Sequence, residues 1–189
     1  MAENKVVFGL KNVHYAVATE EAGTLTYDTP VAIPGAVELS LEPRGDMTEF
    51  YADDILYYHA SNNNGYDGTL SIALIPEHFA VDVLGDMVDE EDGVINESAN
   101  AKQKKFALMF EFDGDQKATR HVVYYCSASR PTVASSTKTE TVEPNTNELT
   151  FVASPRPGDH IVKTKTADSV NESIYDAWYT AVYEKAPGA

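Results

Sequence analysis

Side chains that could ligate a metal ion or move a proton are scattered along this chain. No His-x-x-x-His pair and no Glu-bearing zinc motif joins the five histidines, which are His14, His59, His78, His121 and His160. Zinc sites take their ligands at such short spacings or from residues that the fold gathers. The sequence also lacks a Gly-rich phosphate loop. We therefore predict no metal site and no cofactor, and we expect a protein that is not an enzyme.

Carboxylates are abundant, but their spacing does not suit calcium or acid–base chemistry. The acidic run from Asp86 to Asp92 lacks the alternate-position ligands and the closing Glu of a calcium-binding loop, which predicts a solvated acidic face. Asp53 and Asp54 are adjacent in a segment that we predict to be a strand. Neighbours in a strand point to opposite faces, so these two carboxylates would not share a proton or a metal ion.

The remaining side chains that could react or form an interface belong to cysteine and tyrosine. The single Cys126 lies within a strand pattern and is expected to be a small core residue. The eleven tyrosines favour three interpretations, which are core packing, a protein interface, or aromatic platforms for a sugar. Those in the predicted strands and last helix are Tyr51, Tyr57, Tyr58, Tyr66, Tyr124, Tyr125, Tyr175, Tyr179 and Tyr183.

The segment from Ala101 to Arg156 is the centre of the predicted fold. Phe106, Leu108, Phe110 and Phe112 alternate with smaller or polar residues, which indicates a strand with one well-buried face. Asp113-Gly114 and a second alternating run from His121 to Ala128 complete a hairpin. A second pair of runs, 138–142 and 148–153, is joined by a turn-forming cluster at 143–147. Successive hairpins predict an antiparallel sheet.

Further elements follow in chain order. Strands are predicted over 5–18, with a bulge near Gly9, and over 24–27, 37–41, 50–60 and 70–74. Pro76 and Gly85 bracket a short amphipathic helix. Residues 85–104 form a long acidic loop, which we expect to be mobile in the free subunit and ordered against a neighbour. Ile174, Trp178 and Val182, spaced by four, predict a C-terminal helix over 168–185.

Length and composition limit the classes of protein. A chain of 189 residues with 43% hydrophobic residues predicts one globular domain over 1–189. The formal charge of −16 argues against binding to DNA phosphates, but it would suit a surface past which DNA slides. The first residues lack the pattern of a signal peptide, and no apolar run is long enough for a membrane span. We expect a soluble protein made in the cytoplasm.

Several segments together resemble the major tail proteins of long-tailed bacteriophages, in the phi13-type branch. The resemblance runs in order from about Lys5 to Tyr183 and is specific in combination, although each piece alone is an ordinary strand or turn. The matching segments are 50–54 (FYADD), 65–70 (GYDGTL), 106–114 (FALMFEFDG), 143–150 (EPNTNELT), 153–156 (ASPR) and 177–183 (AWYTAVY).

The resemblance implies a structural virion protein. Its expected fold is mainly β, a β-sandwich or partly closed barrel of two packed antiparallel sheets with a short flanking helix, a C-terminal helix and a long loop. Subunits of this family form hexameric rings that stack into the tail tube, through which DNA passes without specific binding. The implied partners are further copies and the tape-measure, tail-tip and tail-terminator proteins. The protein would then be located in the tail of the virion, which is assembled in the cytoplasm of the bacterial host.

Two sets of residues are candidates for this role. The residues that could give the lumen its acidity are Glu38, Glu42, Asp53, Asp54, Glu111, Glu140 and Glu143. The residues that could form subunit contacts are Val94, Ile95, Tyr175, Tyr179 and Tyr183. A carbohydrate-binding or adhesin-like β-sandwich module stays open as an alternative function, and so does a hydrolase in which the fold gathers His, Asp and Glu side chains.

Overall fold

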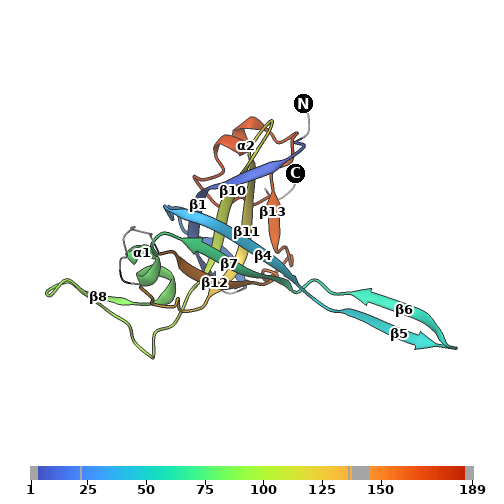
Figure 1. Cartoon of the computed structure of the whole chain (residues 1–189), viewed down its shortest axis with the longest axis horizontal. Coiled ribbons are helices and arrows are strands. Elements are labelled where there is room, and N and C mark those ends of the chain that lie inside the picture. Colours follow the sequence, from blue (N-terminus) through green and yellow to red (C-terminus); the bar gives the residue numbers. More distant parts are fainter. Residues whose placement is uncertain (1–3, 22, 136, 138–144, 186–189) are drawn as a thin grey trace.

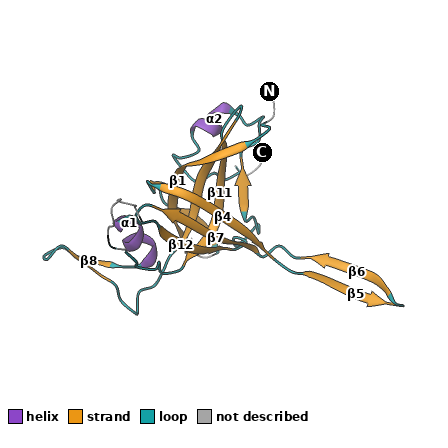
Figure 2. Cartoon of the chain, in the orientation of Figure 1, coloured by secondary structure: helices purple, strands orange, loops and turns teal. Residues whose placement is uncertain are grey.

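The chain folds mainly into strands, with two short helical regions (Figures 1 and 2). The computed structural model describes residues 4–21, 23–135, 137 and 145–185. The strands are β1 (Val7–Glu21), β2 (Thr24–Tyr27), β3 (Val31–Ala32), β4 (Ala36–Arg44), β5 (Met47–Ala52), β6 (Ile55–Ser61), β7 (Gly65–Ile72), β8 (Met87–Asp89), β9 (Val94–Asn96), β10 (Lys105–Gly114), β11 (Thr119–Ala128), β12 (Asn147–Ala153) and β13 (Lys163–Lys165). The helices are α1 (Glu77–Phe79), the π-helical turn η1 (Ala80–Leu84) and α2 (Glu172–Asp176).

One antiparallel sheet forms the body of the molecule. Among the described residues it has nine strands in the order β2-β1-β10-β11-β12-β7-β4, with β3 beside β1 and β13 beside β11. The predicted hairpin of β10 and β11 is confirmed, with Phe110 opposite His121. Strand β12 is also confirmed, but its predicted hairpin partner at 138–142 lies outside the described residues.

The sheet curls so that its two ends share one core. Tyr15 of β1 and Leu70 of β7 are strands apart in the sheet order, yet both belong to the same buried cluster, and β1 also comes into contact with β4. Phe106, Phe110 and Phe151 fill the middle of this inner core. The hydrogen-bonded ladder does not close into a barrel over the described residues. The architecture is therefore the predicted one, mainly β and sandwich-like, with the sheet partly rolled.

A second, smaller core lies on the outer face of β10 and β11. Met109 and Val122, which point away from the inner core, are covered by Trp178 and Val182 of the C-terminal segment. Residues on both faces of β10 are consequently buried. The prediction of a strand with one buried face was wrong, because periodicity in a strand cannot reveal a distant segment that covers its other face.

The C-terminal helix is much shorter than predicted. Instead of spanning 168–185, α2 covers Glu172–Asp176, and its N-cap is Asn171, whose side chain accepts a hydrogen bond from the Ser173 backbone N–H at 3.0 Å. Beyond it the chain turns back, and the Tyr175 carbonyl accepts from the Arg120 side chain and from the Trp178 N–H. Packing of Trp178 and Val182 on the sheet therefore prevails over the helical spacing, and Ile174 stays exposed.

Helix and turn signals near residue 80 are confirmed. The helical stretch starts just after Pro76, buries Phe79, Val83 and Leu84 against the inner core, and ends at Gly85 in the left-handed conformation with φ 85°. The predicted bulge near Gly9 is confirmed too, because the register between β1 and β10 shifts between Phe8 and Leu10.

Residues 85–104 contain more structure than the predicted loop. Strands β8 and β9 form a small hairpin in which Val88 lies opposite Ile95. The Asp89 carboxylate accepts hydrogen bonds from the backbone of Glu91 and Asp92, which shapes the turn. The open base of the hairpin, opposite its turn, is held by Arg130, which pairs with Glu97 at 2.5 Å. Side-chain to backbone hydrogen bonds stabilise the turn of this hairpin. The many carboxylates of the segment favoured the prediction of a loop instead.

The predicted single strand over 50–60 was also wrong. Asp53 and Asp54 both adopt positive φ, 53° and 58°, and reverse the chain between β5 and β6. Two consecutive left-handed residues are the signature of a type I′ hairpin turn. This turn has Asp-Asp at the positions where Asn-Gly is common, so the sequence does not carry the usual signal for it. The two carboxylates therefore sit side by side at a hairpin tip, and not on opposite faces of a strand.

Candidate functional site

The most prominent surface feature is the hairpin β5–β6, which we call the arm (residues 47–61). It projects from the body as a direct continuation of β4 and β7 (Figure 1). Backbone hydrogen bonds bridge the junction, from Asn64 N–H to Arg44 C=O at 2.9 Å and from Asn62 N–H to Asp46 C=O at 3.4 Å. Gly45 is required at this root, since a Cβ there would stand 1.8 Å from the Asn62 carbonyl oxygen. The arm is thus a separate two-stranded sheet that two backbone hydrogen bonds join to the body.

The arm exposes large apolar side chains on both of its faces. Phe50 pairs across the strands with Tyr58, and Tyr51 with Leu56 on the other side of the ribbon. The exposed fractions of these side chains range from 46 to 69%, and the set is Met47, Phe50, Tyr51, Ile55, Leu56, Tyr57 and Tyr58. An isolated two-stranded hairpin is marginally stable in water, and monomers rarely expose contiguous apolar patches of this kind. The arm therefore has the composition of an interface.

An acidic face lies on the outside of the neighbouring sheet. Glu38 and Glu42 of β4 are exposed, and their register places Glu42 beside Asp67 of β7. Glu148 of β12 lies two strands away on the same face, since it pairs with Ser71, which pairs with Glu38. We call Glu38, Glu42, Asp67 and Glu148 the acidic face. Arg44 pairs with Asp67 at 3.4 Å at one end of it.

Sequence reasoning found half of the acidic face. Glu38 and Glu42 were candidates, whereas Asp67 and Glu148 were missed. The alternation that buries Leu70 and Leu149 would have placed Asp67 and Glu148 on the outer side, once the strand order was known. Of the other candidates, Asp53 and Asp54 lie at the tip of the arm, and Glu140 and Glu143 fall outside the described residues.

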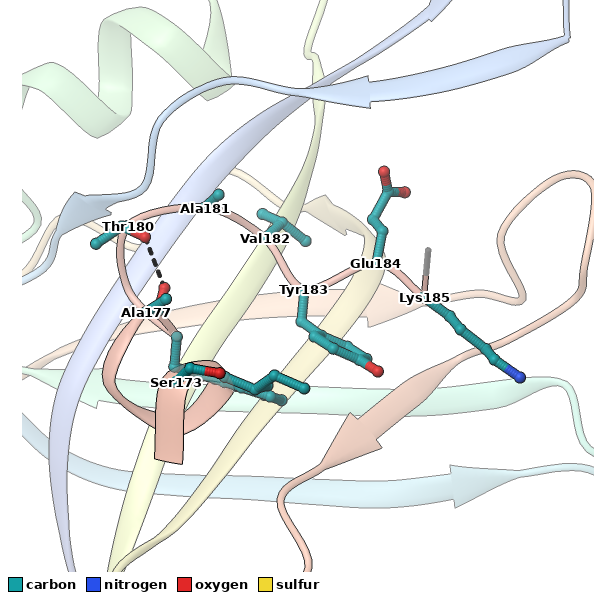
Figure 3. Close-up of a pocket in the computed structure, with 10 residues that line it drawn as sticks. Ser173, Ala177, Thr180, Ala181, Val182, Tyr183, Glu184 and Lys185 are labelled. Carbon is teal, nitrogen blue, oxygen red and sulfur yellow. Dashed lines mark hydrogen bonds between the residues drawn. The ribbon is translucent and has the colours of Figure 1, made fainter. Parts of the chain in front are cut away.

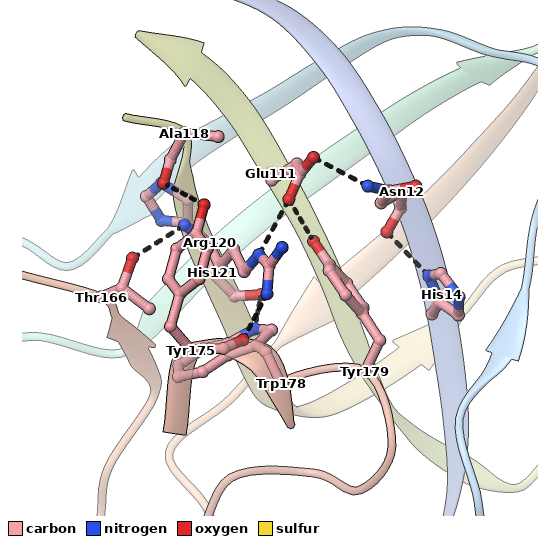
Figure 4. Close-up of polar contacts among 10 residues, drawn as sticks. All are labelled: Asn12, His14, Glu111, Ala118, Arg120, His121, Thr166, Tyr175, Trp178 and Tyr179. Carbon is pink, nitrogen blue, oxygen red and sulfur yellow. Dashed lines mark hydrogen bonds and ion pairs between the residues drawn. The ribbon is translucent and has the colours of Figure 1, made fainter. Parts of the chain in front are cut away.

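Glu111 is placed differently from the other acidic candidates, in a polar network beneath the C-terminal segment (Figure 4). Its residue is 6% exposed, and its carboxylate accepts hydrogen bonds from Arg120 Nε at 3.0 Å and from Asn12 Nδ2 at 2.7 Å. Tyr179 donates its hydroxyl to the same carboxylate at 3.3 Å. Because Arg120 neutralises it, Glu111 adds no free charge to the surface of the protein.

Arg120 connects this network to the C-terminal segment. Its guanidinium lies 3.7 Å from the centre of the Tyr175 ring and donates to the Tyr175 carbonyl oxygen. Burial and the nearby Glu111 carboxylate raise the pKa of the Tyr179 phenol well above its ordinary value, so the phenol stays protonated as a donor. The network therefore fastens residues 171–183 to the sheet.

The predicted contact residues fall into two groups. Val94 and Ile95 are exposed on β9. Tyr175, Tyr179 and Tyr183 are half-buried and engaged within their own chain, with the Tyr175 hydroxyl donating to the Ala118 carbonyl at 3.0 Å and the Tyr183 ring stacked on Trp178. A cavity of about 490 Å³ lies along this segment, lined by Ile174, Trp178, Val182 and their neighbours (Figure 3).

Polar clusters in the described ranges serve the packing of helices and strands. The Tyr15 hydroxyl donates to Asp82 at 2.7 Å and lies 2.8 Å from His78 Nδ1, which ties η1 and α1 to β1. Burial raises the pKa of the Tyr15 phenol and of the Cys126 thiol, which keeps both protonated. In the part of the chain that the structure describes, no three His, Cys, Asp or Glu side chains gather as metal ligands, and no helix is long and apolar enough to cross a membrane.

Comparison with known proteins adds a likeness of fold. No family model and no curated protein matches the sequence. Among solved structures, the tube-terminating cap of the anti-feeding prophage is similar, with a TM-score of 0.51 at 13% identity over 88% of this chain and 95% of that one. The sheath/tube terminator of an extracellular contractile injection system, PVC, in its extended state, has a TM-score of 0.47 at 13% identity over 82% and 94%. At this identity the first likeness concerns the fold alone.

Proposed function

We propose that this chain is a structural subunit that assembles into rings in the tail of a bacteriophage or of a phage-tail-like particle. The observation that carries the proposal is the arm, a two-stranded ribbon with large apolar side chains exposed on both faces. Such a ribbon is stabilised when a neighbouring molecule covers it. The fold shared with a tube-terminating cap supports the same class of protein.

The finer proposal is the tube subunit itself. The resemblance to major tail proteins favours hexameric rings that stack into a tube, together with tape-measure, tail-tip and tail-terminator proteins as partners in the virion. The acidic face supports a DNA conduit, because an inner wall that carries carboxylates repels phosphates and keeps DNA from adhering. Glu38, Glu42, Asp67 and Glu148 are the residues that would line it, and Asp53 and Asp54 at the arm tip would add to it.

A tube terminator is the second candidate function, favoured by the structural likeness to the anti-feeding prophage cap. The two roles differ in how assembly ends. A tube subunit adds to further copies of itself, whereas a terminator forms one ring on the end of a tube made from another protein. Each role uses the arm, but only the tube subunit requires that both sides of a ring accept the same chain.

Electron microscopy of the purified full chain tests the proposal. The tube role predicts rings at high protein concentration and long tubes when a tail-tip initiator is added. The terminator role predicts single rings whatever the initiator. A chain that sediments as a monomer under every condition, and whose melting temperature rises with an added oligosaccharide, would instead support the carbohydrate-binding module.

Charge reversal tests the conduit. Replacing Glu38, Glu42, Asp67 and Glu148 by Lys should leave tubes able to form but slow DNA release, and added salt should partly relieve the defect by screening. A control reverses two other exposed carboxylates, Glu21 and Asp28, and is compared with the Glu38→Lys, Glu42→Lys pair, which changes the net charge by the same amount. Equal release rates for the wild type and the reversed acidic face, with that face located on the inner wall by microscopy, would assign the acidity to solubility.

A further inference from the structure

Two adjoining cavities lie between the helical stretch α1–η1 and the β8–β9 hairpin, at the end of the molecule opposite the arm (Figure 1). Their volumes are about 330 and 540 Å³. Pockets that bind ligands in proteins have volumes in the same range. Glu77 and Ile95 line both cavities, so these two side chains lie between them. One ligand can therefore reach into both.

The smaller cavity is mainly apolar, and we call it the apolar cavity. Its large apolar side chains are Leu74, Ile75, Leu84, Ile95 and Val133. Leu74 and Val133 are 71 and 96% exposed. Removing apolar surface of this kind from water drives binding. Arg130 also lines this cavity, but its guanidinium pairs with Glu97 at 2.5 Å. The apolar cavity therefore fits an uncharged side chain.

The larger cavity has a different lining, and we call it the acidic cavity. Its polar side chains are Glu77, His78 and Asp82, and no lysine or arginine of the described residues lines it. Neither Glu77 nor Asp82 forms an ion pair with a described residue. The turn at 89–92 adds four carboxylates next to Gly93, which also lines the cavity. The electrostatic potential here favours a cation.

Tyr15 holds the polar groups of the acidic cavity in place. Its hydroxyl, on a residue with no exposed surface, donates to Asp82 Oδ2 at 2.7 Å and lies 2.8 Å from His78 Nδ1. Because the hydroxyl proton is given to Asp82, His78 Nδ1 keeps its own proton and donates to the phenol oxygen. In the neutral imidazole Nε2 is then an acceptor. Asp82 and His78 thus provide acceptors whose positions are fixed before a ligand binds, which lowers the entropic cost of binding.

The backbone under the acidic cavity is unusual as well. Asp82 lies in the π-helical turn η1, whose other side buries Val83 and Leu84 in the inner core. Such turns are rare in proteins and occur frequently at functional sites. Packing on the core fixes the turn, and the turn in turn fixes where Asp82 stands. Lys102 and Lys104 run past η1, but neither lines either cavity.

We propose that the two cavities bind a basic segment of another protein, with a lysine or arginine side chain in the acidic cavity and a leucine-sized side chain in the apolar cavity. Side chains two residues apart in an extended peptide lie on one side, about 7 Å apart, so one short segment supplies both. The arm of a further copy does not fit this description, because residues 46–61 carry four carboxylates and no lysine or arginine. The inference goes beyond ring formation, since it concerns a partner other than this chain.

Isothermal titration calorimetry with the full chain tests the two requirements on the ligand. The probe is a blocked peptide with leucine at one position, lysine two residues later and glycine elsewhere. We expect a dissociation constant on the order of 0.1 to 1 mM for so small a ligand. Replacing the lysine by uncharged norleucine, or the leucine by alanine, should weaken binding at least about fivefold. Equal affinity for the lysine and norleucine peptides would overturn the inference.

Variants of the chain locate the binding site. Asp82→Asn with Glu77→Gln should weaken the lysine peptide at least about tenfold and leave the norleucine peptide unchanged, because the amide of Asn still accepts from Tyr15 and only charge is lost. Glu21→Gln with Asp28→Asn, which alters the net charge by the same amount at exposed positions, should have little effect. Circular dichroism checks that each variant is folded. Unchanged affinity in the folded Asp82→Asn, Glu77→Gln variant would overturn the site.

Sedimentation velocity decides whether a second copy occupies the cavities instead. Saturating lysine peptide should leave the self-association of the wild-type chain unchanged. A peptide that dissociates assembled copies would identify a second copy as the occupant and overturn this inference, while the ring-forming function stands. A chain that binds the lysine peptide but stays monomeric under every condition would overturn ring formation and support this inference.

Discussion

Removing the charge of Arg120 should loosen the C-terminal segment more than any other single change in its network. Arg120→Met keeps much of the apolar stem but leaves the Glu111 carboxylate, 6% exposed, without its cation. Breaking a buried ion pair on one side typically costs about 3 to 5 kcal/mol, because the remaining charge is desolvated without compensation. We expect the free energy of unfolding to fall by that amount at neutral pH.

The double variant Glu111→Met with Arg120→Met isolates the pair. Replacing both charges removes the uncompensated carboxylate, but Asn12 Nδ2 and the Tyr179 hydroxyl lose their acceptor. Leaving such donors without a partner costs about 1 to 3 kcal/mol. The double variant should therefore be destabilised by about 1 to 3 kcal/mol. That is less than the cost of Arg120→Met alone. Glu111→Met alone leaves the Arg120 guanidinium without its anion at a similar cost of about 3 to 5 kcal/mol, so the cycle implies a coupling energy of at least about 3 kcal/mol.

Urea denaturation followed by tryptophan fluorescence suits this measurement, since Trp178 is the single tryptophan and its indole donates to the His121 carbonyl at 3.4 Å, beside the network. The same transition followed by far-ultraviolet circular dichroism reports on the sheet. Coincident transitions would mean that the C-terminal segment unfolds together with the sheet. A loss below about 1 kcal/mol for Arg120→Met, or strictly additive single variants, would refute the claim that the pair fastens residues 171–183.

Three further substitutions test the packing of the two cores and the titration of His121. Trp178→Ala should cost about 3 to 5 kcal/mol by circular dichroism, because the side chain is 3% exposed, and a cost under about 1 kcal/mol would contradict its role in the outer core. Gly68→Ala should lower the thermal midpoint at a cost of about 1 to 3 kcal/mol, since a Cβ there would stand 2.2 Å from the Phe151 ring, and an unchanged midpoint would show that this ring can move aside. Burial, with lesser contributions from Lys163 and Lys165, lowers the pKa of His121 from 6.5 to about 4, so the unfolded chain binds more protons between these values and stability falls as pH falls through that window. His121→Phe should remove about 1 to 2 kcal/mol of this loss between pH 6.5 and 4, and parallel pH profiles for the two proteins would contradict the assignment.

Sequence reasoning succeeded where one residue pattern alone decides the structure. Alternation placed β10 and β11, and the bracket of Pro76 and Gly85 placed the helical stretch. Each of these signals is local, since it depends on side-chain period and on backbone geometry within a few residues. Local consistency of this kind is what makes the class of fold readable from one sequence.

The errors arose where distant parts of the chain decide the structure. Glu111 looked like an exposed strand residue until the fold brought Arg120 and Tyr179 to it. The spacing of Ile174, Trp178 and Val182 predicted a long helix. Instead Trp178 and Val182 pack on the sheet, and the chain between them is not helical. The arm was missed because its turn uses Asp-Asp in place of a glycine. Its exposed aromatic residues only became informative once the hairpin was seen to leave the body.

The pairing of β1 with β10 sets the order in which a newly made chain can fold. Val17 lies opposite Phe106, so at roughly 5 to 20 residues per second the ribosome needs roughly 5 to 20 s after completing β1 to supply the partner strand. During that time β1 can pair only with β2 and β3, and Tyr15 and Val17 lack their core. Met109 and Val122 in turn stay uncovered until Trp178 has been synthesised. Folding of this chain is therefore a late, non-local event, and the interval before it is when the nascent chain most needs protection from aggregation.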